Sequence, residues 1–134
     1  MNIFQTLVVK IERMVEFLYK FACFDCKIAF KRKAIKVAGN DSAHLADSDI
    51  AHACPNCGHR MAFMGRNFSA PSMIDKNAWE AAKVLWEAGF RFSGNGYHTD
   101  PALPRSKSEV HIFIIENPNH EQKIGSVQKW ESYA

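Results

Sequence analysis

The chain has 134 residues, enough for one domain or for a small module with an appendage. Hydrophobic residues make up 47% and charged residues 23%, which is ordinary for a folded chain. Seven glycines and five prolines exclude low-complexity and collagen-like classes. A formal charge of +3 is too small by itself to indicate a nucleic-acid-binding protein. The most informative feature is a set of four cysteines arranged in two pairs.

The N-terminal stretch is apolar but interrupted by charge. Apolar residues recur at steps of three and four along residues 1–18, which predicts an amphipathic helix. Five charged residues between Lys10 and Lys20 exclude both a signal peptide and a membrane-spanning helix. The segment after Met14 also has the pattern of a strand, and Met14 is an alternative start of the chain. Without an export signal, we expect a cytoplasmic protein whose thiols stay reduced.

The cysteines form two CxxC pairs separated by 27 residues, Cys23 with Cys26 and Cys54 with Cys57. Zinc takes four soft or borderline ligands in a tetrahedron, with sulfur about 2.3 Å from the ion. A gap of two residues lets both sulfurs of one turn face a single ion. Gly58 follows the second pair, where such a turn needs a positive φ, and Lys27 takes the equivalent position with some backbone strain. The spacing therefore predicts one structural Zn²⁺ bound by all four cysteines.

Short apolar segments flank each pair, as two β-hairpins around one ion require. They cover residues 21–22 and 28–30 around the first pair, and 51–53 and 61–64 around the second. With the sequence CPNCG at residues 54–58, the segment 19–66 resembles a zinc ribbon, a fold found in transcription factors, ribosomal proteins and enzyme appendages. The remainder is similar to small bacterial zinc-ribbon proteins of unassigned function. The resemblance implies a metal-braced scaffold whose surface often contacts a phosphate backbone or stacks bases.

A redox pair and an iron centre are the alternatives to a zinc site. A redox pair usually stands alone near a βαβ pattern, and two pairs at this spacing argue against it. Four thiolates also hold iron, so an iron centre remains the alternative to zinc. His44, His52 and His59 are near enough in sequence to replace a cysteine, but with four cysteines present we expect them at the surface or around the ligands. A closed four-thiolate site leaves no position for water, so we expect no chemistry at the ion.

Positive charge is concentrated beside the first cysteine pair. Residues 27–36 carry five lysines or arginines, and Arg60 follows the second pair. Between Lys20 and Arg66, eight basic and four acidic residues give +4. Four thiolates with Zn²⁺ contribute −2, so the ribbon carries +2 and the patch is only local. The candidates for phosphate contact are Lys31, Arg32, Lys33 and Arg60. A solvated hairpin face explains the same pattern equally well.

The remaining segments are assigned from their patterns. Residues 38–50 predict an acidic loop between the two hairpins, without the closing Glu of a calcium loop. Ser72 with Asp75 resembles a capping box, and a helix is expected over residues 74–88 with an apolar arc wide enough to be buried on two sides. Residues 89–93 predict a strand and 97–108 a loop. Residues 110–115 are apolar on both faces except for His111, which predicts a central or well-covered strand. The tail, with Trp130, either docks or hangs free.

The C-terminal half also contains the residue types of a metal-dependent nuclease, namely His98, Asp100, His111, Asn117 and His120. Four-cysteine sites brace some HNH nucleases. Here the order along the chain does not match that motif, because no paired histidine opens it. Scattered surface histidines are the simpler explanation, so catalysis stays a second alternative.

Together these patterns predict a single α+β protein with an amphipathic helix at 1–18, a four-cysteine zinc ribbon at 19–68, and at 69–134 a helix with a small antiparallel sheet. The function that we favour is a non-catalytic binding or adaptor role. Its partner would be nucleic acid or a nucleic-acid-handling protein, with no membrane involved. The first alternative is a protein–protein interaction module that forms a homodimer through its N-terminal helix.

Overall fold

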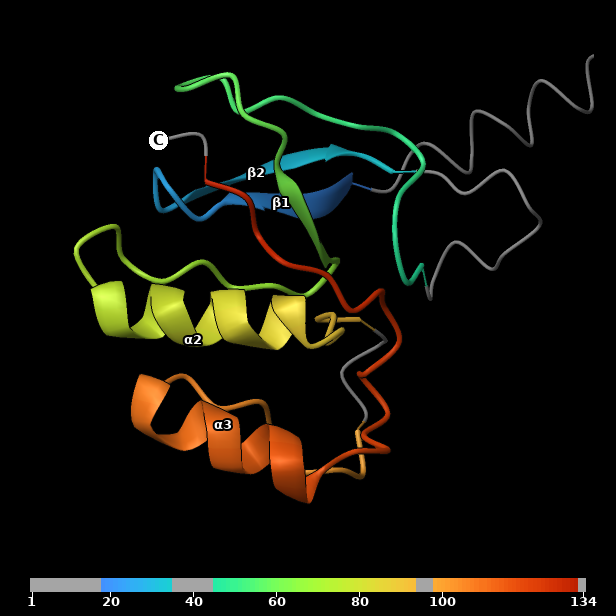
Figure 1. Ribbon diagram of the computed structural model, residues 1–134. Coiled ribbons are helices and arrows are strands. Elements are labelled where there is room, and N and C mark those ends of the chain that lie inside the picture. Colours follow the sequence, from blue (N-terminus) through green and yellow to red (C-terminus); the bar gives the residue numbers. More distant parts are fainter. Residues whose placement is uncertain (1–17, 35–44, 94–97, 133–134) are drawn as a thin grey trace, which may run out of the picture.

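The computed structural model describes residues 18–34, 45–93 and 98–132 (Figure 1). The helix predicted at 1–18 lies outside these ranges, except for Leu18, which begins a strand. The described elements are β1 (Leu18–Cys23), β2 (Ile28–Lys33), β3 (Ala62–Gly65), α2 (Lys76–Glu87) and α3 (Lys107–Glu116). The chain is α+β, as the sequence predicts. Both helices follow the sheet in chain order.

The three strands form one antiparallel sheet in the order β2-β1-β3. The first cysteine pair sits in the turn between β1 and β2, which confirms the hairpin predicted there; the register pairs Phe21 with Phe30. On the other side, β1 pairs with β3 through Phe21 and Phe63, with an irregularity between Lys20 and Phe21. The central strand β1 is therefore hydrogen-bonded on both sides, and β2 is left as an edge strand.

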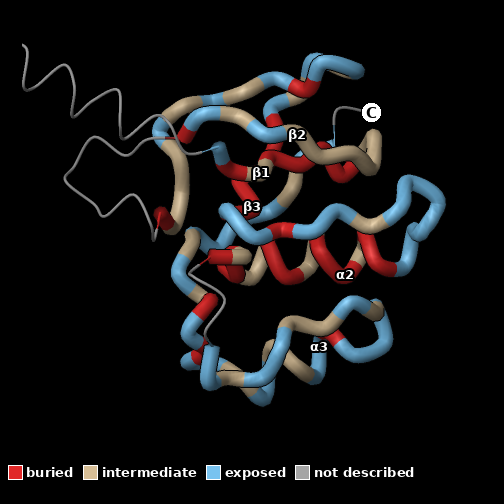
Figure 2. Tube along the Cα trace, turned by 180° about the vertical axis from the view of Figure 1, so that it is seen from behind, coloured by how far each residue is buried: buried red, intermediate tan, exposed pale blue. Residues whose placement is uncertain are grey.

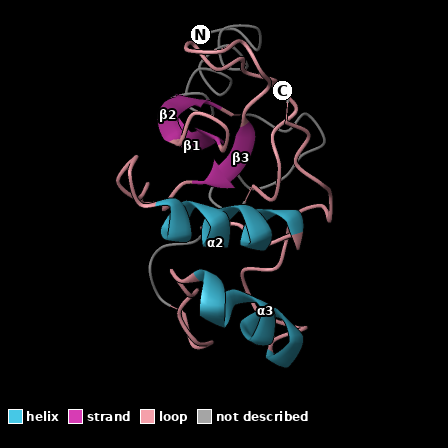
Figure 3. Ribbon diagram, turned by 60° about the vertical axis from the view of Figure 1, so that its left-hand side comes forward, coloured by secondary structure: helices cyan, strands magenta, loops and turns pink. Residues whose placement is uncertain are grey.

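Side chains alternate between the two faces of β1 and enter two different cores. Tyr19, Phe21 and Cys23 belong to a core that also includes Leu45, Cys54 and Met61. The last two belong to the second hairpin, residues 52–61 around the second cysteine pair, which is closed by an isolated bridge between Ala53 and Arg60. Ala22 faces the opposite way, into a core shared with α2. The layers run from the second hairpin through the sheet and α2 to α3, as Figures 1 and 3 show. The sheet is thus covered on both faces.

Helix α2 is buried on two sides, as predicted. One side, with Trp79, Ala82 and Trp86, packs on the sheet. The other side contacts α3 through Ala81 and Leu85. Figure 2 shows buried residues recurring along the length of the helix. The predicted helix is confirmed with narrower bounds, and the predicted cap is wrong: Asp75 is the N-cap, and its carboxylate accepts from the backbone N–H of Ala78 at 3.1 Å.

The strand predicted over residues 110–115 is wrong, because these residues lie in α3. Val110 is fully buried, and Phe113 and Ile114 are partly buried beside it, at the spacing of one helical face. Ile112 and Ile115 are 59% and 77% exposed, so the run is not covered on both sides. The first N–H of the helix, on Lys107, donates to the side chain of Asn77 in α2.

The strand predicted over residues 89–93 is also wrong. Phe90 makes only an isolated bridge with Lys123, and Phe92 exchanges backbone hydrogen bonds with Met64 and Asn67 at the end of β3. Gly65 has φ +104°, and a Cβ there would lie 2.5 Å from the Phe92 carbonyl oxygen. The close approach of these two backbones explains the glycine.

Arg91 links three separate parts of the chain. Its side chain is fully buried and donates to Asp47 through Nε and Nη2, at 3.3 and 3.1 Å. It also donates to the carbonyl oxygens of Trp86 and Phe90 at the end of α2. The other oxygen of Asp47 accepts from the backbone and hydroxyl of Ser126. One ion pair, in which Arg91 is buried and Asp47 is partly exposed, therefore joins the loop before the second hairpin to α2 and to the C-terminal segment.

We predict that Asp47→Ala lowers the free energy of unfolding by about 3 kcal/mol, because it leaves the buried Arg91 cation without its partner. Chemical denaturation measures this change. Asp49→Ala, an exposed acidic residue on the same loop, is the matched control and is expected to cost less than about 1 kcal/mol. Equal losses in the two variants would show that the ion pair contributes nothing specific.

Candidate metal centre

The two cysteine pairs adopt the same turn. The N–H of Lys27 donates to the Cys23 carbonyl at 2.8 Å, and the N–H of Gly58 donates to the Cys54 carbonyl at 2.7 Å. Both closing residues have a positive φ, 57° at Lys27 and 80° at Gly58. This confirms the backbone conformation that the sequence predicts after each pair. Lys27 is the one non-glycine residue with a positive φ in the described part of the chain.

The turns bring the four cysteines together. Their Sγ atoms all lie within 4.8 Å of one another, and the Sγ atoms of Cys23 and Cys57 are 3.7 Å apart. Four sulfurs at about 2.3 Å from a central ion would be separated by about 3.8 Å along each edge of the tetrahedron. A disulfide needs about 2.0 Å, and all four cysteines are free. The four thiols are therefore positioned to bind one metal ion.

The four ligands differ in exposure. Cys23 and Cys54, the first of each pair, are buried in the core between the sheet and the second hairpin, whereas Cys26 and Cys57 are partly exposed. Each pair thus offers one sulfur from the core and one from the surface. The strands carry the inner ligand of the first pair, since Cys23 is the last residue of β1. Two of the four ligands therefore belong to the hydrophobic core, and the site is not formed by surface loops alone.

Backbone N–H groups point at the sulfurs. Burial raises the pKa of the Cys23 thiol well above its ordinary value, and the N–H of Cys26 acts in the opposite direction. At Cys54 burial also raises the pKa, but the N–H groups of Cys57 and Asn56, together with hydrogen bonds from the Cys57 and Cys23 thiols, outweigh burial and the net pKa is lowered. Such donors stabilise thiolates, the form in which cysteine binds a metal. A bound cation would deprotonate the whole set.

Asn56 connects the two pairs directly. It lies between Cys54 and Cys57, yet its side-chain Nδ2 donates to the Sγ of Cys26 in the other pair, at 3.2 Å. Hydrogen bonds of this kind orient metal ligands and tune their basicity. The sequence analysis assigned no role to Asn56, although its place inside the second CxxC pair marks it as a turn residue that could reach across.

Trp130 lies in the tail for which the sequence left docking and hanging free as alternatives, and the structure shows that it docks. Its ring packs edge-on against Phe24 in the first turn and against His59 beside the second, with centroids 5.0 and 4.9 Å apart. Its Nε1 donates to the carboxylate of Asp25, between the first two cysteines. The tail therefore docks on both turns. No local pattern around Trp130 indicates these contacts, because Phe24, Asp25 and His59 lie more than seventy residues away in the sequence.

The structure divides the predicted phosphate contacts among different surfaces. Lys31 and Lys33 are exposed on one face of the edge strand β2, and Arg32 points to the other face, where it stacks over Phe30 at 5.1 Å. Lys31 is the cross-strand partner of Lys20. Burial lowers the pKa of Lys20, and repulsion from the Lys31 charge lowers it further. Arg60 lies apart from them, on the second hairpin.

The residues considered for a nuclease do not gather around one ion. Among residues 18–34, 45–93 and 98–132, the four cysteines are the one group of three or more potential ligands close enough to share a metal. His120 is buried, with Nδ1 accepting from the N–H of Gln122 and Nε2 at 2.7 Å from the Pro101 carbonyl. His98 pairs with Glu121, Asn117 caps α3, and His111 is exposed.

Comparison with protein-family models, with curated proteins and with solved structures finds no match to this chain. Within the part that the structure describes, neither helix has the length and apolar character needed to cross a bilayer.

Asn56 offers a test of the ligand environment. We predict that Asn56→Asp lowers metal affinity by roughly tenfold or more, because a carboxylate would replace the donor that faces the Cys26 sulfur. Asn56→Ala, which removes the donor without adding charge, is expected to have a smaller effect. Competition with a chromophoric chelator measures both. If both variants bound metal like the parent chain, the contact between the two turns would have no part in holding the ion.

Proposed function

We propose that this chain is a non-catalytic zinc-ribbon protein in which Cys23, Cys26, Cys54 and Cys57 hold one structural Zn²⁺ and brace a surface that binds nucleic acid or a nucleic-acid-handling protein. The convergence of the four sulfurs within 4.8 Å carries the first part of the proposal. Zinc suits the site because it accepts tetrahedral sulfur coordination without a preference imposed by d-electrons. Iron is the competing occupant, since the same ligand set holds it.

The closed ligand set supports a structural role for the ion. Catalytic zinc sites keep one position open for water or substrate, and four protein thiolates leave none. The ligands also lie where an ion would stabilise the fold, because two of them belong to the core shared by the sheet and the second hairpin. When bound, the ion would supply cross-linking of the two hairpins and no reaction step.

The nucleic-acid partner is supported by cations that form no ion pair within the described part of the chain. Lys31, Arg32, Lys33 and Arg60 form no ion pair with any carboxylate in the described residues; the pairs found there involve Lys83, Arg91 and His98. Three of the four follow one another on β2, a strand whose outer edge is not paired within the sheet. Unpaired lysines on a free edge are suited to phosphate oxygens, although they also discourage edge-to-edge association.

The protein–protein alternative rests on the predicted helix at residues 1–18, which lies outside the described residues. It predicts a doubled mass in solution that truncation before Met14 abolishes. An unchanged mass after that truncation would remove the dimer hypothesis. That outcome would not bear on the proposed metal centre.

Loss of one inner ligand tests the metal centre as a folding element. We predict that Cys54→Ser releases the ion and removes most of the structure of the ribbon, because metal binding and folding are coupled in such small sites. Metal content and circular dichroism report the two effects. Acidification is also expected to release the ion and destabilise the ribbon, since protons compete with the ion for the thiolates. A variant that kept its secondary structure and melting temperature would contradict a metal-braced fold.

Charge reversal on β2 tests the partner. We predict that the parent protein binds generic DNA or RNA at low salt, and that the double substitution Lys31→Glu with Lys33→Glu weakens this binding at least tenfold. The slope of log affinity against log salt is expected to fall by about 0.7–0.9 for each phosphate contact removed. Lys107→Glu, an exposed lysine on α3, is the matched control. No binding by the parent at low salt would favour a protein partner.

A further inference from the structure

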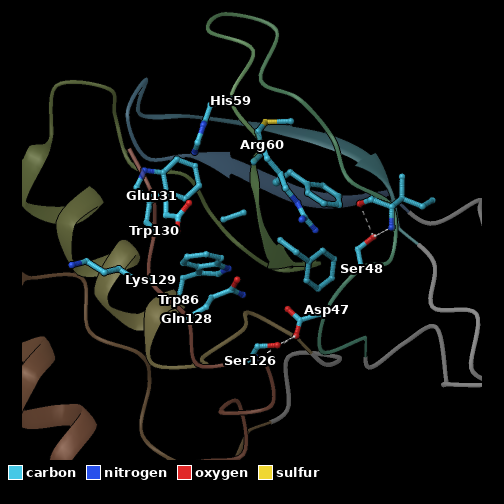
Figure 4. A pocket seen from close by; sticks show the side chains of 15 residues that line it. Asp47, Ser48, His59, Arg60, Trp86, Ser126, Gln128, Lys129, Trp130 and Glu131 are labelled. Carbon is cyan, nitrogen blue, oxygen red and sulfur yellow. Dashed lines mark hydrogen bonds between the residues drawn. The ribbon is translucent and has the colours of Figure 1, made fainter. Parts of the chain in front are cut away.

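A cleft of about 570 Å³ opens between the second hairpin and the C-terminal segment (Figure 4). It lies beside the metal centre but does not include the cysteines. Its walls include Phe63 of β3, Arg60 of the hairpin, Trp86 of α2, and Gln128 with Trp130 of the C-terminal segment. The loop at residues 47–50 and strand β1 also contribute to the lining. The volume is within the range of about 300–1,000 Å³ that is typical of small-molecule sites. Neither the metal centre nor the contacts proposed for β2 make use of this space.

Trp86 is the first sign that the cleft takes a ligand. The residue is 6% exposed, and its indole Nε1 is buried without a hydrogen-bond partner in the described part of the chain. Its ring is held in place by Phe24, Trp130 and the guanidinium of Arg91. A buried donor without an acceptor is unfavourable, so a ligand that supplies an acceptor to this N–H would gain a hydrogen bond that the chain itself does not make.

Arg60 is the second sign, and it comes from the opposite wall. Its side chain extends from the second hairpin into the cleft, above Trp86 and Gln128 (Figure 4). No hydrogen bond or ion pair to the described residues satisfies its guanidinium. Asp47 also lines the cleft, but its carboxylate is already paired with Arg91. An unpaired guanidinium facing an unpaired indole N–H favours an anionic ligand with several acceptor atoms.

The other walls favour a flat, polar ligand. The rings of Phe63, Trp86 and Trp130 border the cleft, and Trp130 is partly exposed there. The side-chain amide of Gln128 makes no hydrogen bond within the described residues and can both donate and accept. Glu131 and Lys129 also line the cleft, and both residues are exposed. Aromatic rings, an amide and a cation together match a nucleobase that carries a phosphate.

We propose that this cleft binds a nucleoside phosphate, with the base against the tryptophan rings and hydrogen-bonded to Trp86, and the phosphate on Arg60. The nucleoside phosphate comes either from a free nucleotide or from one residue of a single strand. For a single strand the inference rests on the proposed function, and it assigns β2 and the cleft to the same polymer.

The experiment measures binding of mononucleotides to the metal-loaded chain by calorimetry and by tryptophan fluorescence. Inorganic phosphate, a nucleoside, a single-stranded oligonucleotide and its duplex are the comparison ligands. We expect millimolar or tighter binding of a mononucleotide, with phosphate and nucleoside each at least tenfold weaker. Arg60→Gln and Trp86→Phe are each expected to weaken nucleotide binding at least tenfold. Arg105→Gln, an exposed arginine outside the cleft, is the control and is expected to change nothing.

Several results would overturn the inference. Binding of phosphate as tightly as the nucleotide would show that the base has no site. Nucleotide binding that is unchanged by Arg60→Gln, an exposed substitution that spares the core, would place the ligand elsewhere. Polymer binding that responds to charge reversal on β2 but not to the cleft variants would refute the cleft and leave the proposed function standing. Mononucleotide binding without polymer binding would instead refute the proposed nucleic-acid partner, support the cleft and identify a free nucleotide as the ligand.

Discussion

The four cysteine sulfurs come together from two turns that are separated by 27 residues, and two of the cysteines lie in the hydrophobic core. A sheet of three short strands buries little surface by itself, so the second hairpin needs a further attachment to stay on its face. Each turn presents one buried and one partly exposed sulfur, and the N–H donors around Cys54 favour the charged form that a metal requires. Metal binding at this position would fix the second hairpin over the face of the sheet that carries Tyr19 and Phe21, and that hairpin also supplies Arg60 to the neighbouring cleft.

The C-terminal segment adds further contacts between the two halves of the chain. Arg91 and Asp47 tie the loop before the second hairpin to the end of α2, and Ser126 joins the same pair. Trp130 then packs against both turns and donates to Asp25. The two halves of the chain therefore share one structure, in which the last described residues contact the first hairpin. This arrangement also forms the cleft, since its walls come from both halves.

Local sequence patterns predicted the parts of this structure that local chemistry determines. The CxxC spacing, Gly58 and Lys27 indicated the two turns, and the apolar arc around Trp79 indicated a helix buried on two sides. The run at 110–115 misled because apolar residues on both faces fit a covered strand as well as a helix. Ser106 and Glu109, spaced as in a capping box, were the available signal for the helix. Long-range contacts carried no signal at all: Asp47 looked like part of an acidic loop, and nothing near Arg91 indicated that it would be buried.

X-ray absorption at the zinc edge of the purified, untreated protein tests the central claim most directly. The account predicts one zinc per chain, surrounded by four sulfur atoms at about 2.3 Å. Nitrogen or oxygen neighbours at about 2.0–2.1 Å would contradict a site made of the four cysteines alone, and an iron signal in place of zinc would contradict the assigned metal.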